Sequence, residues 1–269
     1  MLSDSNARLV AARRLTGRRN RHETGRFLVE GAQAVREALD RPEIVVELFA
    51  TEIALLRYAD LVSIARSRSI VVEEISEKAA MGLSETVTPQ GLIAVCHIFD
   101  LTFESALSRR PSLAAVLVEA NEPGNAGAIL RTADAAGASL VILAGDAVDL
   151  YNGKTVRASA GSIFHLDVVT GTDPEQVVLA CRRSGLLTLA TTGGGTTDLD
   201  ILIDDGSLSA PTAWLFGNEA RGLPESVLEV ADAQVRVPVY GRAESLNLAA
   251  AAAICLYSSA RAQRVTDKR

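Results

Sequence analysis

The sequence is poor in the residues that build disulfide frameworks and metal sites. Its 269 residues include only three cysteines and three histidines. Cys96, Cys181 and Cys255 lie far apart, each in an apolar stretch, which is typical of buried, reduced thiols rather than of a disulfide framework. The spacing of metal ligands does not occur in the chain. We therefore expect neither a disulfide nor a bound metal.

Long apolar runs are also missing. No uninterrupted stretch is long enough to span a bilayer, and the N-terminus is rich in arginine without the apolar core of a signal peptide. The hydrophobic fraction of 48% is nevertheless enough for a substantial core. These features predict a folded cytoplasmic protein that does not bind a membrane.

An overall excess of positive charge, the usual mark of a nucleic-acid-binding protein, is absent, because the formal net charge is −6. The charge is unevenly distributed, however. Residues 1–26 carry seven arginines against two acidic residues, whereas residues 111–269 hold 12 basic and 18 acidic residues. A basic arm on an acidic body suits contact with RNA phosphates, and the candidate residues are Arg18, Arg19, Arg21 and Arg26. Charge alone favours equally a solvated or frayed terminus.

Residues 1–105 alternate between strand-like and helical patterns, which predicts a small α/β domain. The expected strands are 26–31, 44–51, 69–75 and 92–99, and the expected helices are 32–39, 52–67 and a short polar helix after residue 75. We place the domain boundary within residues 100–111.

Residues 111–269 repeat the alternation with longer, more apolar strands, as in a parallel sheet covered on both faces. The expected strands are 113–119, 139–143, 164–169, 186–191, 213–216 and 234–237, and the expected helices are 126–136, 152–159, 174–184, 224–231 and 246–264. This pattern predicts a doubly wound α/β domain whose ligands bind in loops at the carboxyl ends of the strands.

The segment 237–257, VPVYGRAESLNLAAAAAICLY, ends in a helix that is apolar almost all round, so we expect it to be buried. Its consecutive alanines allow other backbone to approach closely. Polar residues crowd its N-terminal end, which suits an anionic or polar ligand. A capped core helix, with Ser245 or Asn247 as an ordinary cap, is the alternative that this segment alone favours.

Four polar loops that contain glycine follow predicted strands. In the first, Asn125 is expected to be the N-cap of the next helix, and Arg131 has only small neighbours at helical spacing, so that an anion could dock there. In the second, Lys154 and Arg157 lie three apart on a predicted helical turn and could grip a phosphate. A surface arginine and a solvated helix face are the respective alternatives.

The third loop contains Thr191, Thr192 and Gly193 and either cradles a nucleotide through backbone N–H groups or is a flexible turn. It matches neither the P-loop nor the GxGxxG pattern. In the fourth, an apolar strand stops at Gly217, and an asparagine, Glu219 and an arginine follow within four residues. Such crowding of polar groups at a strand end indicates a functional site.

These loops resemble, in order, the three sequence motifs of the SpoU/TrmH family of RNA ribose methyltransferases, within the SPOUT superfamily. The matching residues are Asn125-Ala126-Gly127 with Arg131-Thr132-Ala133 and Gly137, then FGNEARGL at 216–223, then Val237-Pro238 with Glu244-Ser245-Leu246-Asn247. Two early stretches, FLVEG at 27–31 and TPQG at 88–91, resemble the family's small substrate-binding domain, which is similar to an RNA-binding ribosomal protein fold. Within the family, the chain is similar to the thiostrepton-resistance type.

The resemblance implies a SPOUT-type parallel sheet with a C-terminal trefoil knot, a homodimer, and S-adenosylmethionine as the cofactor. The backbone at Gly217, Val237 and Leu246 would hold the cofactor, and the loop of Thr191, Thr192 and Gly193 would lie near its adenine. These positions are strand ends and turns, where unpaired backbone groups are able to read an adenine edge.

The resemblance also implies methyl transfer to a ribose 2′-hydroxyl of ribosomal or transfer RNA, with RNA of the large ribosomal subunit as the favoured substrate. The family assigns removal of the hydroxyl proton to Arg131, yet a guanidinium is a poor general base near neutral pH. Either Arg131 is deprotonated in a desolvated pocket, or it stays charged, holds the target phosphate and polarises the hydroxyl. Asn125, Glu219, Ser245 and Asn247 would form the polar surround, with Glu219 orienting Arg131 or a neighbouring donor.

A different functional class is left open by these residues. An RNA-binding or ribosome-assembly factor that retains the methyltransferase fold without catalysis is the alternative. Replacement of Arg131 distinguishes the two, because an assembly role should survive that change.

Overall fold

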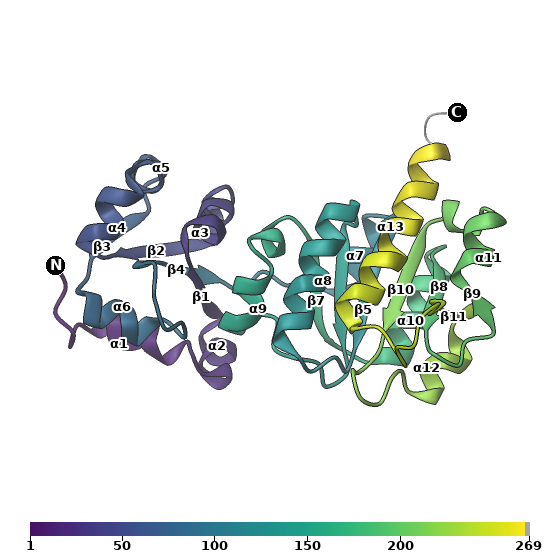
Figure 1. Cartoon of the computed structure of the whole chain (residues 1–269). Coiled ribbons are helices and arrows are strands. Elements are labelled where there is room, and N and C mark those ends of the chain that lie inside the picture. Colours follow the sequence, from purple (N-terminus) through teal and green to yellow (C-terminus); the bar gives the residue numbers. More distant parts are fainter. Residues whose placement is uncertain (267–269) are drawn as a thin grey trace. The chain divides into compact units, whose positions relative to one another are not determined.

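The computed structural model describes residues 1–266 and divides into two compact units (Figure 1). Unit 1 comprises Met1–Phe99 and Asp149–His165, and unit 2 comprises Asp100–Val148 and the chain from Leu166 onward. Each unit has a β-sheet of its own. The sequence-based division differs from this one, because it assigns residues 149–165 to the second domain.

The sheet of unit 1 has four strands in the order β1-β4-β2-β3. The strands are β1 (Arg26–Glu30), β2 (Val45–Ala50), β3 (Val71–Glu74) and β4 (Leu92–His97). Strand β4 is antiparallel to both β1 and β2, whereas β2 and β3 are parallel. All four lie within the ranges expected from the sequence.

The helices of unit 1 connect and cover these strands. They are α1 (Ala7–Arg14), α2 (Arg18–Thr24), α3 (Ala32–Leu39), α4 (Glu52–Arg57), α5 (Ala59–Ser67), α6 (Glu77–Leu83) and α9 (Gly153–Ala158), with 3₁₀ turns at Pro42–Ile44 and Ser162–Phe164. The helical run expected over 52–67 is interrupted at Tyr58, whose φ of −116° and ψ of 39° are not helical.

The basic arm is folded rather than frayed. Leu9, Ala12 and Leu15 are buried and belong to the same core cluster as Phe49 and Ile75 of the unit 1 sheet region. The apolar residues among the arginines therefore fix α1 on the unit and determine which guanidinium groups reach solvent.

Two features bind the segment Asp149–His165 into unit 1. The Arg21 Nη2 and Asp149 Oδ2 atoms lie 2.6 Å apart, with side-chain exposures of only 4% and 9%. The Phe27 ring contacts the rings of Tyr151 and Phe164 at centroid distances of 4.6 and 6.4 Å. A buried ion pair and an aromatic cluster are tertiary features that sequence order does not reveal, and this explains the different division.

The sheet of unit 2 has seven parallel strands in the order β7-β6-β5-β10-β8-β11-β9. The strands are β5 (Leu113–Val118), β6 (Leu140–Ala144), β7 (Asp167–Thr172), β8 (Leu187–Thr191), β9 (Thr197–Asp198), β10 (Thr212–Phe216) and β11 (Ala233–Arg236). The expected α/β class with a parallel sheet is confirmed. Strand β7 begins three residues later than expected, because a 3₁₀ turn occupies Ser162–Phe164, and the short β9 was not predicted.

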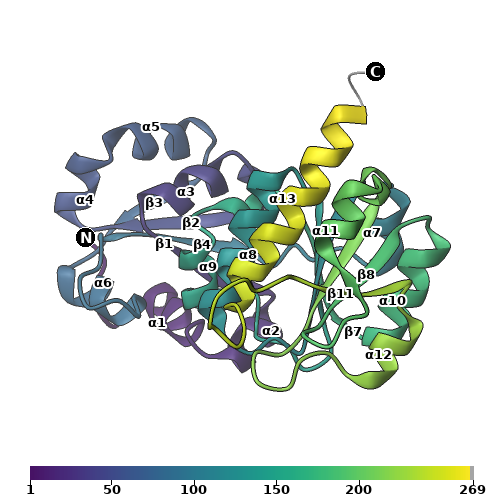
Figure 2. The same cartoon turned by 45° about the vertical axis from the view of Figure 1, so that its right-hand side comes forward.

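Helices cover both faces of this sheet. They are α7 (Phe103–Ser108), α8 (Pro123–Ala136), α10 (Pro174–Arg183), α11 (Leu199–Asp204), α12 (Glu225–Val230) and α13 (Leu248–Thr266), with a 3₁₀ turn at Ser207–Ser209. Helices α8 and α13 pack side by side against β5 (Figure 2). Buried residues of α7, α10 and α12 share one core cluster with alternate residues of β5. Helix α7 occupies the stretch expected to be a domain boundary.

Helix α13 is not buried all round, and that prediction is wrong. Its inner face is buried and includes Ser259, which accepts a 2.9 Å hydrogen bond from the indole of Trp214. On its other face Ile254, Tyr257 and Val265 are 42%, 52% and 53% exposed. The helix is apolar all round in sequence, yet one face has no partner among residues 1–266 of this chain.

The three cysteines are free and buried, as expected. Burial raises the pKa of the Cys181 thiol to about 12 and raises the pKa values of Cys96 and Cys255 as well. Within residues 1–266 no helix is long and apolar enough to cross a membrane. The same residues include no group of three or more His, Cys, Asp or Glu side chains placed to hold a metal ion.

Candidate functional site

The polar loops of unit 2 meet because of the strand order. Strand β5 is followed in sequence by β6 on one side and pairs with β10 on the other, so the direction of winding changes at β5 and β10. In such sheets ligands bind outside the carboxyl ends of the strands at this change of direction. The loops that follow β5, β8, β10 and β11 all leave from neighbouring strands at that edge.

Three of the expected site residues form one hydrogen-bonded chain at this edge. The Asn247 Nδ2 atom donates to Asn125 Oδ1 at 3.1 Å, and the Asn125 Nδ2 atom donates to Glu219 Oε1 at 3.0 Å. Residues that are 94 and 122 positions apart in sequence are thereby joined. The structure therefore brings these three side chains together, and their role in a shared site stays a prediction.

Glu219 also accepts hydrogen bonds from the loop after β5. The backbone N–H groups of Asn121 and Glu122 donate to its carboxylate at 3.2 and 3.3 Å. Burial alone raises the pKa of Glu219, but the hydrogen bonds from Asn125 and the backbone outweigh burial, and its pKa lies below the ordinary value of 4.5. Glu219 is thus a carboxylate that ties the loops after β5 and β10 together.

Asn125 is not the N-cap of α8, and that prediction is wrong. The helix begins two residues earlier at Pro123, with Glu122 as the N-cap residue. Proline has the φ of a first helical residue and lacks an N–H group that would need a partner, so it starts the helix here. The amide of Asn125 is consequently available to Glu219 and Asn247. Gly137 ends the helix with a left-handed φ of 83°, as expected.

Asn247 has both of the roles considered for it. Its Oδ1 atom accepts from the backbone N–H groups of Ala249 and Ala250 at 2.9 and 3.3 Å, which makes it the cap of α13. Its Nδ2 atom points to Asn125. Ser245, by contrast, is exposed and makes no hydrogen bond within residues 1–266.

Arg131 lies on α8, less than two turns beyond Asn125, and is exposed. Its guanidinium has no hydrogen bond or ion pair with any of residues 1–266. Glu219 does not orient Arg131. It binds the neighbouring donor Asn125 instead, which is the second of the two arrangements considered from the sequence.

The loop after β10 depends on a residue that sequence reasoning missed. Glu119 follows β5 with a φ of 51°, which is rare for a residue with a side chain. Its backbone carbonyl accepts from Asn218 Nδ2 at 2.8 Å, and its carboxylate pairs with Arg221 Nη2 at 3.0 Å. The acidic residue at the strand end was visible in the sequence, but its positive φ was not.

The glycines of the expected cofactor loops show where space is required. A Cβ atom on Gly217 would lie 2.3 Å from the backbone carbon of Gly222, and one on Gly195 would lie 2.7 Å from the Arg236 nitrogen. A Cβ atom on Gly193 would have no heavy atom within 4 Å. The loop after β10 is therefore tightly turned at Gly217, the third loop packs closely on β11 at Gly195, and the third loop is open at Gly193, as an adenosyl group held by backbone requires.

Thr191 and Thr192 join the third loop to the neighbouring strands. The hydroxyl of Thr191 donates to the Leu215 carbonyl at 2.8 Å, and the N–H of Thr192 donates to the Val235 carbonyl at 3.0 Å. Val237 follows β11 directly and Leu246, 38% exposed, precedes α13. These expected cofactor residues therefore surround one edge of the sheet, and their chemistry fits S-adenosylmethionine.

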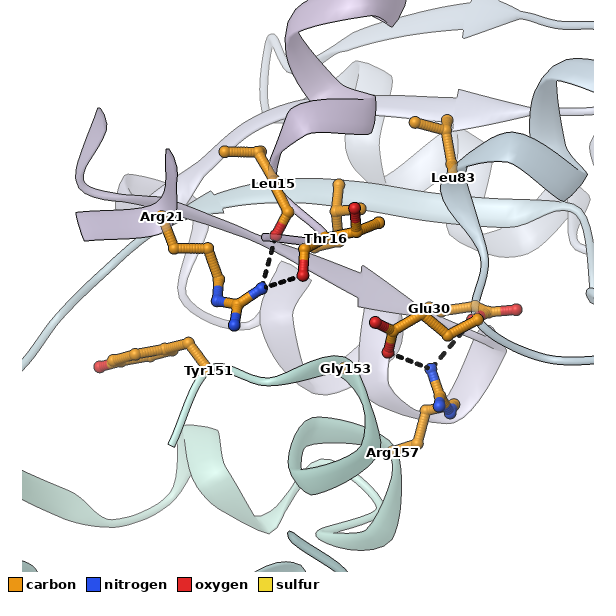
Figure 3. Close-up of a pocket in the computed structure, with 10 residues that line it drawn as sticks. Leu15, Thr16, Arg21, Glu30, Leu83, Tyr151, Gly153 and Arg157 are labelled. Carbon is orange, nitrogen blue, oxygen red and sulfur yellow. Dashed lines mark hydrogen bonds and ion pairs between the residues drawn. The ribbon is translucent and has the colours of Figure 1, made fainter. Parts of the chain in front are cut away.

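Two of the six expected RNA-binding residues have other roles. The Arg21 guanidinium is buried and binds Asp149. It also donates to the carbonyls of Leu15 and Thr16, both at 2.7 Å (Figure 3). The Arg157 Nη1 atom lies 3.4 Å from Glu30 and 3.7 Å from a carboxylate oxygen of Glu85. Carboxylates thus compensate both charges, and we withdraw Arg21 and Arg157 as phosphate contacts.

The remaining expected RNA-binding residues face solvent. Arg18, Arg26 and Lys154 are exposed, and Arg19 is exposed while paired with Glu23 at 2.6 Å. Exposed guanidinium and ammonium groups are suited to RNA phosphates.

The comparisons with known proteins identify the family. The model of the SpoU rRNA Methylase family matches residues 112–257, and that of an MRM3-like substrate binding domain matches residues 6–94. The chain belongs to the SpoU rRNA methylase family. The resemblance recognised in the sequence motifs is confirmed, and the second match shows a substrate-binding domain in the N-terminal part of the chain, where one was expected.

Two curated 23S rRNA 2′-O-methyltransferases are similar to nearly the whole chain. The 23S rRNA (guanosine(2553)-2′-O)-methyltransferase RlmP of Bacillus subtilis strain 168 is 36% identical and covers 95% of this chain and 96% of its own length. A 23S rRNA (uridine(2479)-2′-O)-methyltransferase of Streptomyces viridochromogenes is 32% identical, with 99% and 93% covered.

Solved structures of two methyltransferases agree with this fold. The AdoMet-bound rRNA methyltransferase of Sinorhizobium meliloti superposes with a TM-score of 0.82 at 30% identity and covers 97% of each chain. The SpoU methyltransferase AviRb of Streptomyces viridochromogenes in complex with AdoMet gives 0.81 at 31% identity, covering 97% of this chain and 99% of its own.

Proposed function

We propose that this protein transfers the methyl group of S-adenosylmethionine to a ribose 2′-hydroxyl of ribosomal RNA, most specifically of the large subunit. The observation that carries the proposal is the hydrogen-bonded chain Asn247–Asn125–Glu219 at the carboxyl edge of the unit 2 sheet. Membership of the SpoU family and the names of two 23S rRNA 2′-O-methyltransferase relatives support it.

S-Adenosylmethionine supplies an electrophilic methyl group on a sulfonium. The residues proposed to hold it are those of the three loops: Thr191, Thr192, Gly193, Gly217, Val237 and Leu246. Support comes from the tight turn at Gly217, the close backbone approach at Gly195 and the open space at Gly193. With the methyl donor bound and the ribose positioned, the rate depends on how well the reacting atoms are aligned. In well-oriented reactions such alignment lowers the activation barrier by roughly 7–11 kcal/mol.

Arg131 in this proposal remains charged, holds a phosphate of the target RNA and polarises the ribose hydroxyl. Its exposure and the lack of any partner within residues 1–266 support this account over deprotonation in a desolvated pocket. Asn125 and Asn247, fixed by Glu219, orient the ribose, and Ser245 completes the wall on the exposed side. Only RNA offers the 2′-hydroxyl.

Three finer features belong to the same proposal. The C-terminal segment forms a trefoil knot, supported by the backbone contact of Gly195 with residues 234–236, which leaves no room for a side chain. The protein is a homodimer, supported by the exposed apolar face of α13. A ribosomal RNA substrate implies a cytoplasmic location.

The test is methyl transfer from labelled S-adenosylmethionine to 23S rRNA, with the modified ribose mapped by primer extension. Arg131→Ala is expected to lower the rate by about 10²–10⁴-fold. Because the side chain is exposed, the melting temperature should stay unchanged. Arg183→Ala, which removes an exposed arginine from α10, is the control and should keep full activity.

Transfer that survives Arg131→Ala would remove Arg131 from the mechanism. Measurable cofactor binding without transfer to any ribosomal or transfer RNA would overturn the proposed function and favour a non-catalytic RNA-binding role.

A further inference from the structure

A groove of about 240 Å³ lies within unit 1, and none of the residues that line it is assigned to methyl transfer. It is lined by residues from three parts of the unit: the β1–α3 turn, the loop before β4, and α9 with the residues that follow it. The residues used below are Glu30, Gln33, Thr86, Thr88, Gln90 and Arg157.

Two stretches singled out in the sequence, 27–31 and 88–91, converge on this groove. The Oε1 atom of Gln90 accepts a hydrogen bond from the N–H of Ala32 at 3.0 Å and another from the hydroxyl of Tyr58 at 3.3 Å. Gly31 has a φ of 95°, and a Cβ atom there would lie 3.5 Å from Gln90 Oε1. The turn and the loop are thus fixed to each other with the groove between them.

The charges in the groove compensate each other. Arg157 pairs with Glu30 and Glu85, and Glu30 also accepts from the hydroxyls of Ser84 and Thr86 at 2.5 and 2.9 Å. No surplus positive charge faces the groove to hold a phosphate.

The uncommitted polar groups are neutral. Within residues 1–266 the Thr88 hydroxyl, the Nε2 of Gln90 and the Oε1 of Gln33 make no hydrogen bond. An amide N–H donates, an amide oxygen accepts, and a hydroxyl does both. Such a mixture matches the edge of a nucleobase, which presents donors and acceptors side by side.

We propose that this groove binds one unpaired base of the RNA substrate through Gln90, Thr88 and Gln33. In a duplex that edge is occupied by the partner base, so the groove selects single-stranded or bulged RNA. This inference rests on the proposed function in one respect, namely that the substrate is RNA.

The test measures RNA binding by the full chain without S-adenosylmethionine. The probes are a short fluorescein-labelled single-stranded RNA of mixed sequence and the same strand annealed to its complement, followed by fluorescence anisotropy. The wild-type protein is expected to bind the single strand more tightly than the duplex.

Gln90→Glu is the informative variant. It keeps an oxygen for Ala32 and Tyr58 but replaces the free Nε2 donor with a second carboxylate oxygen. We expect single-strand binding to weaken about tenfold, the size of one lost hydrogen bond, with duplex binding unchanged. Gln176→Glu makes the same change of charge on the exposed surface of unit 2 and should leave the Kd unchanged.

Thr88→Val and Thr88→Ser separate the hydroxyl from the shape of the side chain. The valine variant should weaken single-strand binding and the serine variant should restore it. Melting temperatures measured in parallel show whether a variant has merely failed to fold.

Equal Kd values for wild type, Gln90→Glu and Thr88→Val, or equal binding of single strand and duplex, would overturn the inference. Undetectable binding of the single strand by wild type would do the same. Since no methyl transfer is measured, these results are independent of the assay that tests the proposed function.

Discussion

At the scale of single residues, the site depends on carboxylates and amides that satisfy backbone groups and one another. Glu219 accepts from Asn125 and from two backbone N–H groups, and Asn247 caps a helix while it donates to Asn125. Each side chain therefore has its rotamer fixed by a second contact, which is how a polar site is kept in one geometry.

Glu219→Gln is expected to loosen this site. The amide that replaces one carboxylate oxygen is a donor and faces the donors of Asn121 or Asn125. We expect the free energy of unfolding to fall by about 1 kcal/mol at most, because solvent screens the interactions of this exposed carboxylate. We also expect methyl transfer to be slower. Urea unfolding monitored by Trp214 fluorescence measures the first effect, and Glu229→Gln, at an exposed position of α12, is the control that should change neither.

The comparison of wild type with Glu219→Gln also gives a prediction for the pH dependence of stability. The folded-state pKa of Glu219 is below 4.5, so its carboxylate contributes stability above that value and loses the contribution as the pH falls through the folded-state pKa. The difference in stability between wild type and Glu219→Gln should be constant near neutral pH and disappear once Glu219 is protonated. A difference that persisted in acid would show that the effect does not come from the carboxylate.

At the scale of elements, periodicity predicted most strands and helices. Helix α3 lies at the expected residues, Ala32–Leu39, because its apolar spacing and the preceding glycine define it. The strand β9, the break at Tyr58 and the start of α8 at Pro123 were missed. Such features depend on local backbone geometry that hydrophobic patterning does not contain.

The site was predictable as a set of loops but not as a set of contacts. The motif resemblance named Asn125, Glu219 and Asn247, which the structure joins, but also Ser245, which is exposed and outside the hydrogen-bonded chain. Glu119 escaped notice because its importance lies in a positive φ and in a carbonyl, neither of which is visible in a residue type.

The loop after β10 gives a prediction at this scale. In Gly217→Ala the new methyl group would lie 2.3 to 2.5 Å from backbone atoms of Gly222 and Leu223. This stretch of backbone is unable to move away without breaking the pairing of Asn218 with Gly222. We expect a loss of about 1–3 kcal/mol in stability and weaker cofactor binding, measured by thermal melting and calorimetry. Gly194→Ala, where a Cβ atom meets nothing within 4 Å, should melt like wild type.

At the scale of the molecule, unit 1 is discontinuous in sequence. The ion pair Arg21–Asp149 and the contacts of Tyr151 and Phe164 with Phe27 bring the segment Asp149–His165 into it. The family match for the substrate-binding domain covers only residues 6–94. A fragment limited to those residues would leave the Phe27 ring and the Arg21 guanidinium without their buried partners.

Asp149→Ala tests the importance of that segment. The Arg21 side chain, 4% exposed, would be left charged and buried, with only two carbonyls as partners. Removing one partner of a buried ion pair lowers the free energy of unfolding by about 3–5 kcal/mol. Hydrogen exchange of peptides from unit 1, read by mass spectrometry, should rise sharply. Asp60→Ala removes a carboxylate from the exposed Arg36–Asp60 pair and should leave exchange unchanged outside its own helix.

The exposed face of α13 gives the last prediction. Ile254, Tyr257 and Val265 are 42% to 53% exposed and recur at helical spacing, so they form one apolar stripe. A stripe of this kind in a folded chain marks an interface, and the proposed homodimer would cover it.

Ile254→Arg places a charge in that stripe and is expected to convert the dimer to a monomer in sedimentation velocity. Leu56→Arg, which alters a residue that is 78% exposed on α4 of unit 1, should remain dimeric. A wild-type monomer, or a dimer that survives Ile254→Arg, would refute this interface. The hydrogen bonds that join Asn247, Asn125 and Glu219 all form within one polypeptide, so a monomer keeps them. Whether the monomer still transfers methyl groups then decides whether the second subunit completes the site.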